Sequence, residues 1–549
     1  MKQFVFIAAC IVLSFFACNN KPAIEQDLTI TKKTAFNSLF FDSSQLENYF
    51  KKNSQLAKYK EQYIAFYKLR NYQFAWIDVK GFDEQAIHLA NLVNNAVGNL
   101  QDSSIYVSNF LSSYNSMLVD GLENVETNEI LETELLLTGQ FFNYVAKVYK
   151  GMDINAEELG WFIPRKKVDL SKLLDTIIKS KQYEVDSYLP FNSQYYKLQE
   201  QLKVYYQLQK KYTWDTFAIP TKVYKKGDSS VYIKKLKNYL FRFGDLKIQD
   251  TSKKYTTETE KAIKSFKRRF GLPIDGNISK RFVQELNVSI KTRIEQLLVN
   301  LERARWLPAE KDSNYILVNI PEYKMHIYDS AVNKWDINVI VGKAATSTVI
   351  FTGNLKHIVF SPYWRLPTSI IKNEVMPKYR KDKSYLARNG MEIYAKGDSF
   401  PLIRQKPGPK NSLGLVKFLF PNSYDIYFHD TPERSLFGAN DRSFSHGCIR
   451  VGEPAKLAQY LLRKDTTYKP QIIDSLMHLP KEKWVTLPKA VPVYLVYFTT
   501  WVDKNGKLNF RKDIYKHDEK MANKLFDREP IISKDSLIAL KKKQEIKNN

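Results

Sequence analysis

The sequence is poor in cysteine, with three in 549 residues, and this excludes a disulfide framework. Glycine and proline are also scarce, at 20 and 21 residues, which excludes collagen-like and low-complexity chains. Beyond the N-terminal segment, no apolar run reaches the roughly 20 residues that a membrane-spanning helix needs. Neither a phosphate-cradling glycine loop nor a metal-ligand spacing of histidines and cysteines is present. We therefore expect no nucleotide, metal or other cofactor.

Acidic residues are under-represented. Lys and Arg total 84 against 58 Asp and Glu, a net charge of +26. Such an excess favours a polyanionic partner: nucleic acid, an anionic membrane surface or an acidic cell-wall polymer. A generally basic background that keeps the protein soluble is the alternative. No motif with base-reading spacing is present, so we do not expect nucleic acid to be the partner.

The N-terminus reads as an export signal. Lys2 precedes an apolar run from Phe4 to Ala17, which is too short to span a bilayer and ends at Cys18. The closing residues resemble a bacterial lipoprotein signal, which implies that residues 1–17 are removed and that Cys18 takes the lipid. A plain secretory signal is the alternative. We expect a periplasmic protein anchored by lipid to a bacterial membrane, with the outer membrane favoured.

Four segments follow the signal. Residues 18–40 are polar and suit a tether, and residues 41–215 show apolar spacing typical of helices, as at Ala86, Leu89 and Val93. Residues 216–290 alternate helix faces with glycine turns. This third segment resembles the three-helix peptidoglycan-binding module, which implies binding to the bacterial wall. The matching positions are Gly227, Leu236, Gly244, Phe266, Gly271, Leu272, Asp275, Gly276 and Leu286.

The apolar period changes near Ser313. A connecting helix over 291–312 gives way to alternating residues such as Ile316, Val318, Met325 and Ile327, which predict a β-rich domain over 313–515. A proline-rich, charged stretch over 364–414 interrupts the strands and suits either a lid or a surface excursion. Residues 516–549 form a charged tail. The whole predicts a multi-domain α+β protein, with a helical N-terminal scaffold, a small three-helix module and a C-terminal β-rich domain with an inserted lid.

Two segments of the β-rich domain carry groups suited to acyl transfer. One runs from Asp425 through His429 to Asp430, and the other contains Ser445-His446-Gly447-Cys448. Only a thiolate attacks an acyl carbon well, at an ordinary pKa of roughly 8.5, and we expect a nearby imidazole and backbone N–H groups to lower that value.

The neighbours of the thiol suit the same chemistry. Gly447 allows backbone N–H groups to approach a developing oxyanion. Arg450 can hold a carboxylate on the same side of an extended strand as Cys448. His446 and His429 are both candidate bases. The spacing alone does not choose between them.

The two segments together resemble the signature of the YkuD-type L,D-transpeptidase catalytic domain. The resemblance implies that Cys448 is the nucleophile, that His429 is the proton acceptor and donor, and that the Asp430 carbonyl orients its ring. It implies an oxyanion role for Tyr427 and the N–H groups around Gly447. It further assigns supporting or substrate-binding positions to Ser445, His446, Arg450 and Trp364.

The rest of the chain resembles the large multi-domain, YcbB-like branch of that family. The matching pieces include residues 74–78, 303–308, 318–321, 362–364, 406–411 and 418–422. This resemblance implies a peptidoglycan enzyme that joins the third residues of two stem peptides. An L,D-carboxypeptidase with water as the acceptor, an enzyme that attaches proteins to the wall, and a non-catalytic wall-tethering lipoprotein are the alternatives. The sequence carries no signal for an oligomeric state.

Overall fold

The computed structural model describes residues 25–35, 37–152, 155–165, 167–180, 185–309 and 312–528. The predicted signal peptide, Cys18 and the last residues of the tail lie outside the described residues. The chain divides into two compact units, residues 1–151 with 167–190 and residues 152–166 with 191–549. No helix in the described ranges has both the length and the apolar character needed to cross a bilayer.

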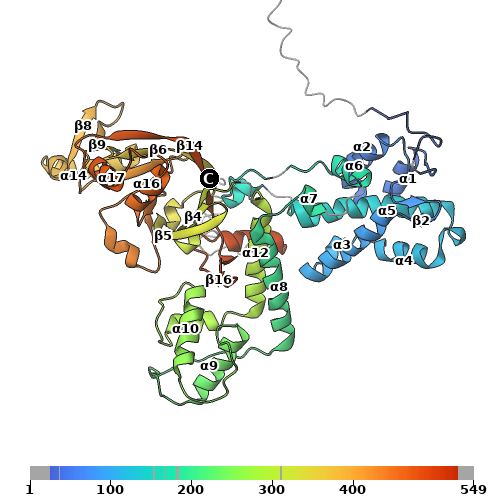
Figure 1. Cartoon of the computed structure of the whole chain (residues 1–549), viewed down its shortest axis with the longest axis horizontal. Coiled ribbons are helices and arrows are strands. Elements are labelled where there is room, and N and C mark those ends of the chain that lie inside the picture. The colour runs from blue at the N-terminus through green and yellow to red at the C-terminus, as the bar shows by residue number, and fades with distance from the viewer. Residues whose placement is uncertain are drawn as a thin grey trace, which may run out of the picture. The chain divides into compact units, whose positions relative to one another are not determined.

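The first unit is helical and is built around α5 (Thr127–Val145), which is buried almost throughout its second half. Around it lie α1 (Gln45–Lys52), α2 (Lys60–Lys68), α3 (Glu84–Leu100), α4 (Phe110–Asp120) and α6 (Leu170–Ser180) (Figure 1). The buried Glu134 carboxylate accepts hydrogen bonds from the backbone N–H groups of Ala75 and Trp76, at 2.6 and 3.0 Å. This bonding ties α5 to the segment that follows α2.

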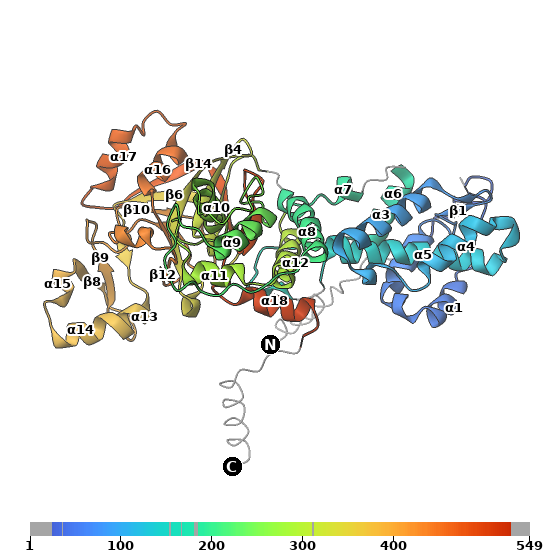
Figure 2. The same ribbon diagram turned by 90° about the horizontal axis from the view of Figure 1, so that it is seen from below.

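The second unit contains two long helices that lie side by side, α8 (Ser193–Lys211) and α12 (Ile290–Trp306), as Figures 1 and 2 both show. The expected scaffold range of 41–215 includes α8. In the structure, however, α8 contacts α12 and β15 (Thr500–Val502) and belongs to the second unit. The cause is its buried face, which includes Leu198 and Leu202.

The three-helix module comprises α9 (Val231–Arg242), α10 (Thr257–Arg269) and α11 (Lys280–Leu286). The predicted helix faces are confirmed, since Ile233, Leu236 and Phe266 are each 0% exposed. Phe270 stacks on Phe510 of β16 (Leu508–Phe510), with ring centroids 5.2 Å apart. The module therefore packs against the β-rich domain through the chain's C-terminal strands.

The β-rich domain is a nine-stranded sheet in the order β12-β5-β13-β11-β10-β6-β14-β3-β4. Because β4 also pairs with β5, the sheet closes on itself. The strands are β3 (Tyr315–Asn319), β4 (Lys324–Asp329), β5 (Val332–Gly342), β6 (Thr352–Phe360), β10 (Val416–Leu419), β11 (Phe428–His429), β12 (Ser443–Ser445), β13 (Ile449–Val451) and β14 (Lys483–Val496). The expected alternation is confirmed, with Ile316, Val318, Met325 and Ile327 all 0% exposed.

The insertion is a small folded body rather than an interruption without strands (Figure 2). Its elements are β7 (Trp364–Arg365), α13 (Thr368–Ile370), a π-helical turn (Ile371–Val375), α14 (Met376–Lys381), α15 (Tyr385–Arg388), β8 (Met391–Ala395) and β9 (Leu402–Gln405). The three strands pair in the order β7-β9-β8. The insertion has its own core of Leu366, Ile371, Val375, Leu386 and Ile403, and these residues are too scattered for a sequence period to reveal.

The chain continues after β13 with α16 (Pro454–Leu462) and α17 (Pro470–Met477), and it ends its described part with α18 (His517–Leu525). Asp518 of α18 forms an ion pair with Arg303 of α12 at 2.5 Å and accepts a 2.6 Å hydrogen bond from Thr499. The start of the predicted tail is therefore anchored to the second unit.

Candidate active site

Two neighbouring strands bring the candidate residues to one face. β11 and β13 pair in parallel, with Phe428 opposite Ile449. Both of these side chains are 0% exposed, so they point into the core of the closed sheet. Side chains alternate along a strand, so the flanking positions point to the other face. The residues on that outer face are Tyr427, His429, Cys448 and Arg450.

The ring of His429 is fixed by the next peptide. Its Nδ1 donates a 2.5 Å hydrogen bond to the carbonyl oxygen of Asp430. A carbonyl only accepts, so Nδ1 carries the proton and Nε2 keeps a lone pair. Burial lowers the pKa of His429 to about 3, and the charges of Arg450 and Lys417 act in the same direction. His429 is therefore a neutral base at pH 7.

Cys448 is half-buried at the start of β13, and its Sγ lies 3.5 Å from the carbonyl oxygen of Asp425. Burial raises the pKa of the thiol, while hydrogen bonds from the backbone and hydroxyl of Tyr427 lower it. The expected net decrease is therefore wrong for this state, because the loss of solvent outweighs the hydrogen bonds. In the described part of the chain, no hydrogen bond joins this thiol to the His429 ring. The resting site holds a neutral thiol on the same face as a neutral imidazole.

The turn before Cys448 is closed by one buried hydroxyl. Ser445 Oγ donates to the Cys448 carbonyl at 2.6 Å and accepts from the Gly447 N–H at 3.1 Å. Gly447 has a φ of +120°, in the region that favours glycine, and its carbonyl accepts from Thr348 Oγ1 at 2.8 Å. The Gly447 N–H is therefore already used inside the turn. Of these two backbone groups, the Cys448 N–H is the better candidate to donate a hydrogen bond to an oxyanion.

His446 lies at the surface beside the insertion. Its side chain is 58% exposed, and its Nε2 lies 3.8 Å from a carboxylate oxygen of Glu374 in the insertion. The positions of His446 and His429 therefore differ, although the sequence did not distinguish between them as bases. His429 shares the face of Cys448, whereas His446 faces the insertion.

Asp430 supports the site through its carboxylate, a role that sequence reasoning missed. It accepts from the backbone N–H of Leu415 at 2.9 Å and of Thr431 at 2.6 Å, and it pairs with Arg434 at 2.6 Å. Burial raises its pKa. Gly414 lies against it with a φ of +62°, and a Cβ added there would fall 2.4 Å from the Asp430 Cγ. In the sequence, the one hint of this contact is the spacing of Asn411 and Gly414, which is typical of a turn.

The predicted substrate-binding residues lie in different surroundings. Arg450 forms an ion pair with Glu433, and its Nε is a buried donor that has no hydrogen-bond partner among the described residues. Trp364 belongs to the insertion, where it packs against that body's apolar core and pairs in register with Gln405. Arg450 shares the face of Cys448, and Trp364 comes from a separate element.

Comparisons with known proteins divide the chain into three matched regions. Residues 313–473 match the YkuD family, described as the L,D-transpeptidase catalytic domain. Residues 61–202 match a family described as the scaffold domain. Residues 229–286 match the family described as "Putative peptidoglycan binding domain".

One curated protein, "Putative L,D-transpeptidase" of Haemophilus influenzae, is 30% identical over 268 residues, which cover 45% of this chain and 54% of that protein. The chain thus spans about half the length of this curated relative.

Among solved structures, the L,D-transpeptidase of Stackebrandtia nassauensis is 14% identical, with a TM-score of 0.21, and covers 51% of this chain and 97% of its own. The L,D-transpeptidase of Xylanimonas cellulosilytica is 13% identical, with a TM-score of 0.17, and covers 51% and 100%. At such low TM-scores, neither structure supports a conclusion about this chain. The three matched regions do support one. The chain contains a YkuD-type L,D-transpeptidase catalytic domain, joined in one polypeptide to a scaffold domain and a peptidoglycan-binding domain.

Proposed function

We propose that this protein forms 3→3 cross-links between peptidoglycan stem peptides through a thioester on Cys448. The donor would be a tetrapeptide stem, cut at the L,D peptide bond between its third and fourth residues. The acceptor would be the side-chain amine of the third residue of another stem. The observation that carries the proposal is the outer face shared by Cys448, His429, Tyr427 and Arg450, inside a region that matches the catalytic domain.

The acylation step uses the neutral pair. His429 Nε2 takes the Cys448 proton as the sulfur attacks the donor carbonyl, so the charged form exists only transiently in a buried setting. The C–N bond then breaks, and His429 returns the proton to the leaving amine. The terminal D-amino acid departs, and the third residue stays bound to sulfur as a thioester.

Deacylation reverses the roles. The acceptor amine attacks the thioester carbonyl, His429 removes a proton from the amine, and the sulfur leaves and regains a proton. The Cys448 N–H and the Tyr427 hydroxyl are the proposed donors to the oxyanion of both tetrahedral intermediates. The proposed role of Arg450 is to bind a substrate carboxylate. In the structure the Glu433 carboxylate takes that place.

The accessory regions suit work on a polymeric wall. The peptidoglycan-binding module would keep the enzyme on its substrate, and a lipid on Cys18 would hold it in the periplasm, so both act by raising effective concentration.

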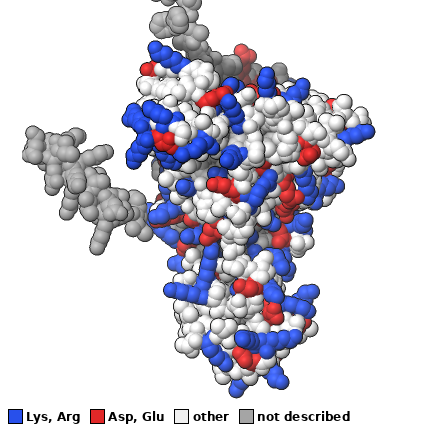
Figure 3. Space-filling view, turned by 90° about the vertical axis from the view of Figure 1, so that its left-hand side faces the viewer, with Lys and Arg blue, Asp and Glu red and all other residues white. Residues whose placement is uncertain are grey.

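On the face drawn in Figure 3, basic side chains outnumber acidic ones. The exposed bases of the insertion include Lys372, Lys378, Arg380, Lys381 and Lys383. This positive charge would favour binding to an anionic wall polymer.

The test is to incubate the purified protein with disaccharide-tetrapeptides and read the products by mass spectrometry. We expect release of the terminal D-amino acid together with 3→3 dimers. His429→Ala should remove both products, whereas His446→Ala is the matched control and should keep most of the activity. A tripeptide product without dimers would indicate a carboxypeptidase. Unchanged substrate would indicate a non-catalytic protein that tethers the wall.

A further inference from the structure

The second unit contains a cavity on the far side of the closed sheet from Cys448. Following the ring β5-β13-β11-β10-β6-β14-β3-β4, the strands of the candidate active site lie opposite β14 and β3. The cavity has a volume of about 590 Å³ and is lined by residues of β3, β4, β14 and α8 and of the turn after β15. This volume lies in the range of about 300–1,000 Å³ that is usual for small-ligand sites.

One wall of the cavity is aromatic. The rings of Tyr315 and Tyr328 stack with centroids 4.3 Å apart and an angle of 9° between planes, and Tyr494 meets Tyr315 edge-on at 5.6 Å. The Tyr494 hydroxyl donates to Asp312 at 3.1 Å. These tyrosines alternate with core residues such as Ile316 and therefore lie on the outer face of the sheet.

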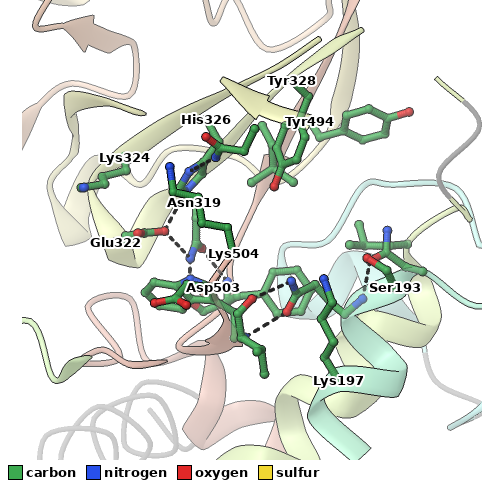
Figure 4. Close-up of a pocket in the computed structure, with 18 of the residues that line it drawn as sticks. Ser193, Lys197, Asn319, Glu322, Lys324, His326, Tyr328, Tyr494, Asp503 and Lys504 are labelled. Atoms are coloured by element: carbon green, nitrogen blue, oxygen red, sulfur yellow. Dashed lines mark hydrogen bonds and ion pairs between the residues drawn. The ribbon is translucent and has the colours of Figure 1, made fainter. Parts of the chain in front are cut away.

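The adjoining wall is polar and carries charges of both signs. His326 binds the Asp336 carboxylate at 2.7 Å and the Glu322 carboxylate at 2.9 Å. Burial opposes its charged form, but the two carboxylates raise the pKa of His326 to about 9. The Lys324 ammonium lies 3.9 Å from Asp336. The side chains of His326 and Lys324 thus face the carboxylates of Glu322 and Asp336, and Arg511 also lies near Glu322. Figure 4 shows how the polar side chains of Asn319, Glu322, Lys324 and His326 gather.

The opposite side of the cavity comes from elements outside the matched catalytic region of residues 313–473. Gln194 of α8 exchanges two hydrogen bonds with the backbone of Val502, at 2.9 and 3.0 Å, and this joins α8 to β15. Lys197 and Lys504 are exposed on these elements. Figure 4 draws Ser193 and Lys197 on the helix, and Asp503 and Lys504 beside β15.

These features select one class of ligand. The lining carries charges of both signs, and an anion would meet the carboxylates of Asp312, Glu322, Asp336 and Asp503 as well as the basic side chains. An extended peptide would need a free strand edge, but β3 and β4 each have a partner on both sides. A neutral sugar chain has flat apolar faces for the tyrosine rings, and hydroxyl and acetamido groups for the polar wall.

We propose that this cavity is a glycan-binding site that holds N-acetylated sugars of the peptidoglycan strand, away from the site of peptide chemistry. The proposal rests on the proposed function for its choice of polymer. It gives the enzyme a second hold on its substrate, next to but separate from the three-helix module.

The test is calorimetric titration of the full chain with a soluble β-1,4-linked tetramer of N-acetylglucosamine. Val332 lines the cavity and is 56% exposed, so Val332→Trp should fill the cavity without disturbing the core. We expect binding to weaken about tenfold in Val332→Trp and in Tyr328→Ala. Tyr468→Ala, in the loop after α16 and outside the cavity, is the matched control and should bind like the wild type.

Binding that is absent in the wild type, or equal in the wild type and Val332→Trp, would overturn the proposal. Equal binding would assign the sugar to the three-helix module. Release of the D-amino acid from a sugar-free tetrapeptide should be unchanged in Val332→Trp. If that release is missing in the wild type while the sugar still binds, the proposed chemistry fails and the glycan site stands.

Discussion

The Ser445 hydroxyl holds the turn before Cys448 with two hydrogen bonds, and its removal gives a sharp prediction. Ser445→Ala deletes the 2.6 Å donation to the Cys448 carbonyl and the 3.1 Å acceptance from the Gly447 N–H. Ser445 is only 3% exposed, so water cannot readily replace the hydroxyl. The change leaves one acceptor and one donor unsatisfied in a buried turn.

The magnitude follows from these two groups. An unsatisfied buried polar group costs about 1–3 kcal/mol, and neighbouring losses are not fully additive. We therefore expect the turn to lose about 2–4 kcal/mol of local stability. A turn that relaxes by about 1 Å misplaces the sulfur, and such a misplacement costs on the order of 10²-fold in rate. The turnover number should fall more than the Michaelis constant rises.

The assay combines D-amino acid release with hydrogen–deuterium exchange of peptides covering β12 and β13. Ser443→Ala is the matched control, because Ser443 lies two residues away on the same strand. Its hydroxyl forms a 3.0 Å hydrogen bond with the Tyr323 hydroxyl rather than with the turn. The control should change exchange and rate little. If Ser445→Ala exchanged and turned over like Ser443→Ala, our account of the turn would be refuted.

Four further predictions concern titration, packing and location. Because burial raises the pKa of Cys448, its alkylation by iodoacetamide should still accelerate with pH above roughly 8.5, and a plateau below pH 7 would contradict this. The folded pKa of His429 lies below its unfolded value, so its protonation favours unfolding as the pH falls from about 6.5 towards about 3, and His429→Gln should make acid unfolding less steep. Asp245→Ala should leave Arg269 buried without its carboxylate, cost the three-helix module about 3–5 kcal/mol and weaken pelleting with sacculi; unchanged thermal unfolding would refute it. Cys18→Ser should move the protein from the membrane fraction to the soluble fraction, and an unchanged distribution would place the anchor elsewhere.

Much of the fold could be predicted because its periods are local. The alternation at Ile316 and Val318 predicts a strand by itself, and the glycine turns of the three-helix module predict where its helices end. The insertion was predicted less well. Its strands β8 and β9 carry few buried residues, of which Ile403 is one, so their period is weak. The position of α8 depends on contacts with α12 and β15, which no local pattern contains.

The candidate site shows the same division. The Ser-His-Gly-Cys motif predicts Cys448 as the nucleophile, but the choice between His429 and His446 as the base depends on the register of β11 against β13. Burial reversed the expected direction of the Cys448 pKa, because a sequence does not show how much solvent a thiol loses. The cavity around His326 was not predicted, since its lining comes from segments between residues 192 and 511.

The central claim is that a stem peptide becomes attached to Cys448. The most direct measurement is mass spectrometry of the intact protein after rapid mixing with a tetrapeptide stem and acid quenching, followed by peptide mapping. We predict an added mass equal to the stem without its terminal D-amino acid, on the peptide that contains Cys448, and no such mass in Cys448→Ala. An adduct on another residue, or D-amino acid release by Cys448→Ala at the wild-type rate, would contradict the account.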